Sequence, residues 1–429
     1  MAELAALGRA TARGRSGRRA ALAWAVWACM PALVAGQAAS GWDAGPGAAS
    51  YGQRGTLGGA AAIWGEAGRV VLPGLVLDPA LAKAAEVCAR WLGDHAASEL
   101  PPGFIEFSLR WAGCSDPTAV SLAVLTSEDS PDELWEQLRV LRGRAGFRHT
   151  HWGFGGAASH RERFRSAWVA LLAERKLELE PVPRAVEAGR ELLLVARWVG
   201  EALANPRLVV LGPGEAMRET AGRLADGRVT MGSGALREPG EYTLEILADG
   251  GFGPEVLALL PIRVGGEPGT SWAGPAAGRA APLSTPEAEQ RLLELANEER
   301  RRANLPPLIP DPVLQAVARA HSADMAEHGF FGHRSPQRGD FNERFQTSGW
   351  RAMRAAENLS KSESILDAHA GLMTSPAHRS NILSPYFTHV GIGVAARQGG
   401  LGRTEFVITQ VFGLPMPGGT PPGRTRAPR

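Results

Sequence analysis

The spacing of apolar residues changes twice along this chain, and each change predicts a different kind of structure. Between residues 72 and 175 the spacing is helical. One helix is predicted to begin at Asp78-Pro79, because aspartate is a common N-cap and proline suits the first helical turn. A second helix is predicted after Ser130-Pro131. The apolar positions that set the two helical phases are Leu81, Ala85, Cys88 and Leu92 in the first helix, and Leu134, Leu138 and Leu141 in the second.

Between residues 177 and 265 apolar residues alternate with polar ones, which is typical of strands. The segments are short and are separated by glycine-containing turns such as Glu238-Pro239-Gly240. This pattern predicts a small antiparallel β-sandwich of immunoglobulin-like type. The alternating positions include Leu192, Leu194 and Ala196, the run from Leu208 to Leu211, and Tyr242, Leu244 and Ile246. The segment carries no catalytic motif, so we interpret it as a spacer or an interaction module.

Helical spacing returns from residue 284 onward. Ser284 is predicted to cap a helix, with Pro286 in its first turn and Glu287 near the positive end of the helix dipole. A second helix places Leu314, Val317, His321 and Met325 on one face. His321 is therefore predicted to be a hydrogen-bonded core residue and not a ligand. Together with the two preceding segments, this pattern predicts an α+β chain.

The first 37 residues are predicted to be a secretory signal peptide. Several arginines precede the apolar stretch Ala20–Ala35, and small residues follow it. A membrane anchor is the alternative, but the stretch is short for a span and is interrupted by Pro31. Arg18-Arg19 leaves a twin-arginine signal open, and Cys29 leaves a lipoprotein signal open. We expect a secreted or periplasmic protein whose mature chain has no transmembrane span.

Three stretches lack a periodic apolar pattern. Residues 38–71 are rich in Gly, Ala and Ser and are predicted to be a flexible leader. Residues 266–283 are rich in Gly, Pro and Ala and are predicted to be a linker between domains. Residues 417–429 are predicted to be a disordered tail, because they are rich in proline and basic residues.

Charge and cysteine content narrow the class of protein. The formal net charge is +2, and the basic N-terminus supplies it, so the remainder is slightly acidic and gives no reason to expect nucleic-acid binding.

Cys29 lies in the predicted signal peptide, which leaves Cys88 and Cys114. A disulfide between them would close a loop of about 25 residues and stabilise the fold by roughly 3 kcal/mol. Two buried free thiols are the alternative.

Four short motifs lie between Phe330 and Ala395, and they place two histidines and an acid in one domain. The motifs are FFGHRSP, AAENLS, SPAHRSNIL and HVGIGVA, which contain His333, Glu357 and His378. Their order and spacing resemble the CAP superfamily of cysteine-rich secretory, antigen 5 and pathogenesis-related proteins, specifically its bacterial SCP-like branch. The resemblance implies an α-β-α sandwich over residues 284–416 and a ligand-binding cleft formed by these three residues.

The resemblance also implies a fourth polar residue. Eukaryotic members carry a second acid on the helix before the last histidine, and the aligned position here is Ser375. Glu363 and Asp367 are the nearest acids, but each needs a different helix phase. The chain therefore fills three of the four polar positions.

Three hypotheses for function follow from these residues. A secreted binding or defence-type protein with a lipid, cell-wall or protein ligand is the leading one, since most members of the superfamily have no established reaction. Two imidazoles and a carboxylate can also hold zinc or a similar divalent ion, so His333, His378 and Glu357 are candidate ligands of a metal-dependent hydrolase. An adhesion or scaffolding protein is the third hypothesis. A polar cluster with a structural role only remains open, as does the question of whether this protein is an enzyme.

The chain is also predicted to repeat part of itself. The segment LDPALAKAAEVCAR at 77–90 is similar to PDPVLQAVARAHSA at 310–323, and THWGFGGAA at 150–158 is similar to THVGIGVAA at 388–396. We interpret residues 72–175 as a degenerate copy of the C-terminal domain, with chance resemblance as the alternative. The copy has no counterpart of the histidine and glutamate motifs, and Val140 stands at the position that corresponds to His378.

Overall fold

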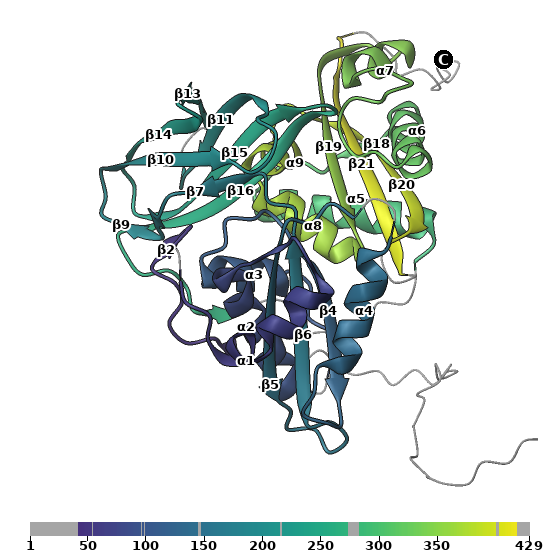
Figure 1. The fold of residues 1–429 in the computed structure, drawn as a ribbon. Coiled ribbons are helices and arrows are strands. Elements are labelled where there is room, and N and C mark those ends of the chain that lie inside the picture. The colour runs from purple at the N-terminus through teal and green to yellow at the C-terminus, as the bar shows by residue number, and fades with distance from the viewer. Residues whose placement is uncertain are drawn as a thin grey trace, which may run out of the picture. The chain divides into compact units, whose positions relative to one another are not determined.

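In the computed structural model, a four-stranded sheet with helices on both faces occurs twice, and a β-sandwich lies between the two in sequence (Figure 1). The structure describes residues 42–53, 55–95, 97, 99–144, 147–214, 217–272, 283–399 and 403–417. All of these belong to one unit, Ala38–Arg429. The predicted signal peptide, most of the predicted tail and part of the predicted linker lie outside the described residues.

The C-terminal domain is a three-layer α-β-α sandwich, as predicted. Its elements are α5 (Thr285–Arg302), β18 (Ile309–Pro310), α6 (Pro312–His328), α7 (Phe341–Thr347), β19 (Ala352–Ser362), α8 (Ile365–Thr374), α9 (Pro376–Ile382), β20 (His389–Gln398) and β21 (Thr404–Pro415). The sheet has the order β18-β20-β21-β19, so β19 is an edge strand. One apolar cluster joins α6 and α7 to one face of the sheet, and another joins α5, α8 and α9 to the opposite face.

Two glycines on β20 allow α6 to lie unusually close to the sheet. A Cβ atom at Gly391 would stand 2.0 Å from the backbone carbon of Leu314, and one at Gly393 would stand 2.2 Å from the backbone nitrogen of Arg319. No side chain fits at either distance, so the absence of a side chain brings helix and strand into direct contact. This packing fixes the N-terminal half of α6 on the sheet, and the loop with His333 follows the other end of the helix.

The N-terminal unit has the same architecture. Its elements are α1 (Gly59–Val71), β3 (Val76–Leu77), α2 (Pro79–Asp94), α3 (Phe104–Ala112), β4 (Val120–Thr126), α4 (Asp132–Arg142), β5 (His151–Ala158) and β6 (Ser166–Ala173). Its sheet has the order β3-β5-β6-β4, with the same parallel and antiparallel pairings as the C-terminal sheet. Helices α2 and α3 cover one face and α1 and α4 the other.

Local geometry matches between the two units as well. In each, an aspartate caps the helix after the first strand, Asp78 for α2 and Asp311 for α6. In each, a threonine hydroxyl is 2.9 Å from Nδ1 of the next histidine, at Thr150 and at Thr388. These shared features support the interpretation of the N-terminal unit as a degenerate copy.

The prediction of a flexible leader over residues 38–71 is wrong for its second half, which forms helix α1. The residues that α1 buries are Ala61, Gly65, Gly68 and Val71, so its packing face consists mainly of small side chains. Gly68 accommodates the ring of Trp152, which would stand 2.1 Å from a Cβ atom there. A small-residue face carries no strong apolar signal, which explains why the sequence pattern missed this helix.

Three short strands also fall in segments predicted to lack structure. Strand β1 (Trp42–Asp43), in the predicted leader, pairs with β17 (Ser271–Trp272), in the predicted linker. Strand β2 (Ser50–Tyr51) pairs with β8 (Val182–Pro183) of the sandwich. The buried hydroxyl of Tyr51 donates to the carbonyl of Pro261 at 2.8 Å. Pairing with distant strands holds these segments, and a local pattern does not contain that information.

The central segment is the predicted β-sandwich. One sheet has the order β13-β14-β10-β7 and the other β12-β11-β15-β16-β9. The strands are β7 (Leu177–Leu179), β9 (Ala185–Val186), β10 (Arg190–Trp198), β11 (Ala204–Leu211), β12 (Arg218–Ala221), β13 (Arg223–Ala225), β14 (Arg228–Leu236), β15 (Gly240–Gly250) and β16 (Gly253–Val264). Of the apolar residues named above, all except Val209 and Leu211 fill the space between the two sheets.

Cys88 and Cys114 are both buried and free, so the structure agrees with the thiol alternative and not with the disulfide. The Cys88 thiol lies 3.4 Å from the hydroxyl of Ser108. Burial raises the pKa of the Cys88 thiol to about 12. A thiol with such a pKa is inert at neutral pH, which fits a role in packing.

Candidate functional site

The loop between α6 and α7 positions His333. Helix α6 ends at Gly329, which has a positive φ of 69° and turns the chain out of the helix. The backbone N–H and C=O groups of Ser335 and Gly339 then bond to each other and close a compact loop. Asp340 caps α7, with its side chain accepting from the backbone N–H of Glu343. Helix α7 in turn carries Arg344 toward the sheet.

His333, Glu357 and Arg344 form a direct hydrogen-bonded cluster. Nδ1 of His333 lies 2.9 Å from Oε1 of Glu357. One guanidinium nitrogen of Arg344 donates to both carboxylate oxygens of Glu357, at 2.9 and 2.8 Å. The other donates to the carbonyls of His333 and Gly339, at 2.8 and 2.9 Å. Arg344 therefore fixes both the loop and the carboxylate that orients the imidazole.

Burial makes this cluster electrostatically strong. The Glu357 side chain is 1% exposed and that of Arg344 is 6% exposed, whereas His333 is 24% exposed. Burial alone would raise the pKa of Glu357, but the hydrogen bond from His333 and the charge of Arg344 hold it below its usual value. Glu357 is thus ionised at neutral pH, and His333 is the member of the cluster that reaches the surface.

His321 lies beneath the cluster, as the helical pattern predicted. It is fully buried, and its Nε2 is 3.0 Å from the carbonyl of Gly332. Burial lowers the pKa of His321 to about 4, although the nearby Glu357 acts in the opposite direction. The neutral ring holds the His333 loop against α6 by a hydrogen bond to its backbone.

His378 lies on α9, on the other side of edge strand β19 from the glutamate. Ser375 caps this helix, and its hydroxyl accepts from the His378 backbone N–H at 3.4 Å. The amide of Asn358, the residue after Glu357, donates to the carbonyl of His378 at 3.0 Å. Burial first, and then repulsion from His333, lower the pKa of His378 to about 4. Glu357 and Asn358 are successive residues of β19, so their side chains point to opposite faces of the sheet. Strand β19 therefore contacts His333 through Glu357 and His378 through Asn358.

Two charged residues of this region were not found from the sequence. Arg344 belongs to no motif, and only its burial beside Glu357 identifies it. Glu245 comes from strand β15 of the sandwich, is fully buried, and accepts hydrogen bonds from the hydroxyl of Ser375 and from the backbone N–H of Ala377, the latter at 3.1 Å. A carboxylate therefore does meet position 375, but it comes from a different domain.

The predicted metal ligands do not form a metal site in this arrangement. Among the residues that the structure describes, no three His, Cys, Asp or Glu side chains are grouped so that they could hold a metal ion. Glu357 directs its oxygens at Arg344 and His333, and His378 makes its described contacts through its backbone. The residues present thus do not fit a bound divalent ion, and we derive no step through one.

A cavity of about 1020 Å³ lies away from His333 and His378. It is lined by residues of α3, α5, α8, β16 and β17, including Glu106, His369 and Trp272, and by none of His333, Glu357 and His378. Burial raises the pKa of Glu106 to about 7 and lowers that of His369 to about 4. The cavity and the histidine cluster are therefore separate features, and the cluster is the one that the sequence motifs identify.

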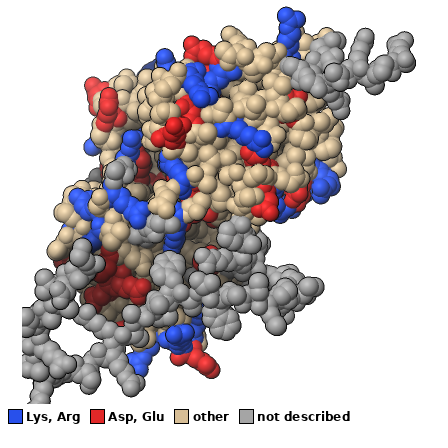
Figure 2. All heavy atoms as spheres, turned by 90° about the vertical axis from the view of Figure 1, so that its right-hand side faces the viewer, with Lys and Arg blue, Asp and Glu red and all other residues tan. Residues whose placement is uncertain are grey.

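The surface near α5 and α6 has mixed charge. On the face shown in Figure 2, Lys and Arg side chains are interspersed with Asp and Glu, and neither sign forms a broad area among the described residues. A ligand at this face would be recognised by local groups and not by a general field.

Comparisons with known proteins give a family and a set of bacterial relatives. Residues 293–412 match the model of the cysteine-rich secretory protein family, CAP. Two proteins of Bacillus subtilis are similar in sequence: the uncharacterized protein YkwD, 35% identical over 30% of this chain and 50% of its own length, and the uncharacterized membrane protein YlbC, 32% identical over 25% of this chain and 31% of its own length. The match thus spans half or less of each relative.

Among solved structures, an extracellular protein of Bacillus anthracis with an SCP domain is 18% identical, with a TM-score of 0.27 and coverage of 67% of this chain and 93% of that one. The family model covers the loop that carries His333, the strand that carries Glu357 and the helix that carries His378. By the family model, residues 293–412 of this chain are a CAP domain, and both sequence relatives of this region are bacterial.

Proposed function

We propose that this is an exported binding protein whose CAP domain holds a polar ligand against His333 and His378, with a cell-wall glycopeptide as the ligand class. The observation that carries the proposal is the use of Glu357. Its carboxylate is completely engaged by Arg344 and His333, so its role is to preorganise an imidazole. Preorganised, partly exposed polar groups bind a ligand at low entropic cost.

The same geometry argues against Glu357 as a general acid or base. Efficient proton transfer at neutral pH needs a pKa near 7, whereas the pKa of Glu357 is held below its usual value. The pKa of His378 is lowered to about 4, so its ring is neutral and can offer one donor and one acceptor. Such groups suit the amides and hydroxyls of a glycopeptide better than an acyl chain.

Export is part of this proposal. It is supported by the basic and apolar N-terminal pattern. Among the described residues, no helix is long and apolar enough to span a membrane. The N-terminal sequence of protein recovered from the producing cells tests it. A start near residue 38 agrees with export through a cleaved signal, and a start at Met1 contradicts it.

The experiment for binding uses insoluble peptidoglycan sacculi in a pelleting assay. Wild-type protein is expected to pellet with sacculi at neutral pH, and the double variant His333→Ala/His378→Ala to bind at least about tenfold less, as the loss of two hydrogen-bonding groups at about 1 kcal/mol each predicts. The matched control is Ser121→Ala in the N-terminal unit, which is expected to bind like wild type.

Equal binding by the double variant would contradict the proposed site. Binding to phosphatidylglycerol vesicles but not to sacculi, lost in the same variant, would contradict the ligand class. The hydrolase hypothesis is tested separately by metal analysis of the purified protein. A stoichiometric divalent ion that is absent from the double variant would replace the binding proposal with the metal-dependent one.

A further inference from the structure

The sandwich strand β15 carries a buried carboxylate that its own domain does not use. The residues Tyr242, Leu244 and Ile246 face the sandwich core, so Glu245 points to the opposite face. Its partners across the neighbouring strands are Val209 and Leu259, which are also buried. An ionisable group between two apolar neighbours is costly unless another part of the molecule bonds to it.

The C-terminal domain supplies that bonding. Both carboxylate oxygens of Glu245 are engaged by the segment that begins α9, one by the Ser375 hydroxyl and the other by the Ala377 N–H. Ser375 in turn accepts from the N–H of His378. A continuous chain of hydrogen bonds therefore runs from the sandwich to the backbone of a site histidine.

The same sandwich hairpin also contacts the second site histidine. Between β15 and β16, the carbonyl of Phe252 accepts from the N–H of Arg334 at 2.8 Å. The Phe252 ring packs 5.4 Å from that of Phe330, and a Cβ atom at Gly253 would lie 3.3 Å from Cβ of His333. The hairpin thus supports the His333 loop directly, at a position where a larger residue than glycine would press on the histidine.

We propose that the sandwich is a structural half of the histidine site, with Glu245 as the positioning residue for His378. The inference rests on the proposed function, because it assigns a role within the same site. It also changes the interpretation of the sandwich from a spacer to a part of the site. An isolated domain of residues 284–416 would leave the first turn of α9 and the His333 loop without this support.

The test follows the ring of His378 by NMR, which needs no ligand. In protein with labelled histidine, the His378 ring of wild type is expected to titrate at about pH 4. In Glu245→Ala the first turn of α9 loses its anchor and water reaches the ring, so the midpoint is expected to rise by about one pH unit or more. Glu245→Gln keeps an acceptor of the same shape and is expected to restore the wild-type midpoint.

The matched control is Glu241→Ala, an exposed glutamate on the same strand. It is expected to leave the midpoint unchanged. If Glu245→Ala fails to fold, Ser375→Ala breaks the same chain of hydrogen bonds from the other side and should produce the same rise.

An unchanged His378 midpoint in the folded Glu245→Ala or Ser375→Ala variant overturns the proposal, even if stability falls. A rise that Glu245→Gln does not reverse overturns it as well, since the effect would then not depend on the acceptor. Because the readout is the ring and not sacculus binding, failure here and failure of the proposed function are distinguishable.

Discussion

The N-terminal and C-terminal units share a frame and differ in what fills it. Both have the same strand order, the same aspartate-capped helix and a pair of glycines that brings that helix onto the sheet. Gly153 and Gly155 meet α2 as Gly391 and Gly393 meet α6. A Cβ atom would stand 2.1 Å from the α2 backbone at both N-terminal glycines, and 2.0 and 2.2 Å from the α6 backbone at Gly391 and Gly393. A frame that occurs twice does not itself require the polar residues of the site.

Those polar residues are confined to the C-terminal unit. Equivalent positions in the two units are identified by the sheet register for strand residues and by the distance from the capping aspartate for helix residues. With the C-terminal residue first, the equivalent positions are His321 and Cys88, Ser322 and Ala89, Glu357 and Ser121, Asn358 and Leu122, Thr409 and Val169, and Gln410 and Ala170. Every C-terminal member is buried and polar. In the N-terminal unit Ser121 is the polar member of this set, and the other five positions hold apolar residues.

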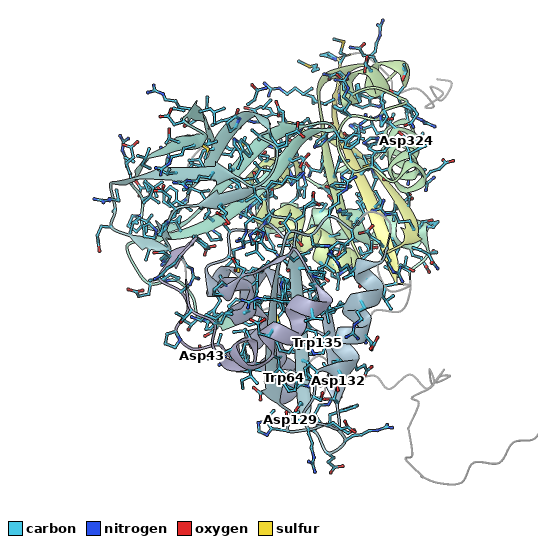
Figure 3. All side chains as sticks on the ribbon, viewed as in Figure 1. Asp43, Trp64, Asp129, Asp132, Trp135 and Asp324 are labelled. Atoms are coloured by element: carbon cyan, nitrogen blue, oxygen red, sulfur yellow. The ribbon has the colours of Figure 1, made fainter. Side chains whose placement is uncertain are left out.

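Aromatic packing takes the place of polar contacts in the N-terminal unit. Trp64 on α1 and Trp135 on α4 belong to the helix layer over one sheet face (Figure 3). Trp64 packs 6.5 Å from Trp168, and Trp135 packs 6.4 Å from Trp152. The comparison teaches that an apolar interior is sufficient for this fold. The buried polar residues of the C-terminal unit therefore serve the site, although removing them from water lowers the stability of the fold.

Removal of Arg344 should produce the largest difference in stability between the two units. Arg344→Ala leaves the ionised Glu357 buried without its ion pair, and a loss of about 3–5 kcal/mol in the free energy of unfolding is expected. Urea denaturation measures it. Ser121→Ala, at the position in the N-terminal unit that matches Glu357, should cost less than about 0.5 kcal/mol. Similar losses for the two variants would contradict the claimed difference.

Acid should destabilise the C-terminal unit through its buried histidines. His321 and His378 have folded pKa values of about 4, below the unfolded value of about 6.5. The unfolded chain binds more protons between these values, so stability falls as pH drops from 6.5 towards 4, by up to about 1.4 kcal/mol per pH unit for each ring. His321→Cys, which introduces the residue of the N-terminal unit, should reduce this slope in urea denaturation at pH 7, 5.5 and 4.5. An unchanged slope of stability against pH would show that the fold does not lower the pKa of His321.

Because the two units share a frame, an alanine should lower stability equally at equivalent glycines of the two sheets. Gly391→Ala and Gly153→Ala each place a methyl group about 2 Å from helix backbone, which cannot move as a side chain can. Both should lower stability by about 3 kcal/mol, the upper end of the overpacking range. Thermal unfolding of the two variants measures this. A large effect in one unit alone would show that the two helix–sheet contacts are not equivalent.

The smallest effect concerns the amide beside the glutamate. Asn358→Leu, which copies Leu122, removes bonds to Asn381, Gln410 and the carbonyl of His378. The unpaired partners should cost about 2 kcal/mol. The double variant Asn358→Leu/Gln410→Ala copies both residues of the N-terminal pair and should cost less than the sum of the two single changes. Strict additivity in denaturation would mean that the two amides are not coupled.

Much of this organisation could be predicted from the sequence because it is local. Asp78-Pro79 and Ser284 are helix starts in the structure, and alternating glycines mark both close helix–sheet contacts. The three motif residues were identified because each stands in a distinctive short segment.

The parts that could not be predicted depend on contacts between distant segments. Helix α1 packs through small residues and so has no apolar stripe. Arg344 and Glu245 are ordinary charged residues in sequence, and only the fold brings Glu245 to Ser375, 130 positions away. The metal prediction depended on three side chains meeting, whereas Arg344 takes up the carboxylate between them.

The central claim is that Glu357 and Arg344 orient His333 so that its outer nitrogen is free for a ligand. The nitrogen chemical shifts of the His333 ring at pH 7, assigned by comparison with His333→Ala, test this most directly. An ionised Glu357 oxygen at 2.9 Å from Nδ1 can only accept a hydrogen bond, so Nδ1 must be the donor and the account predicts a protonated Nδ1. A bare Nδ1 would contradict the cluster and, with it, the proposed binding site.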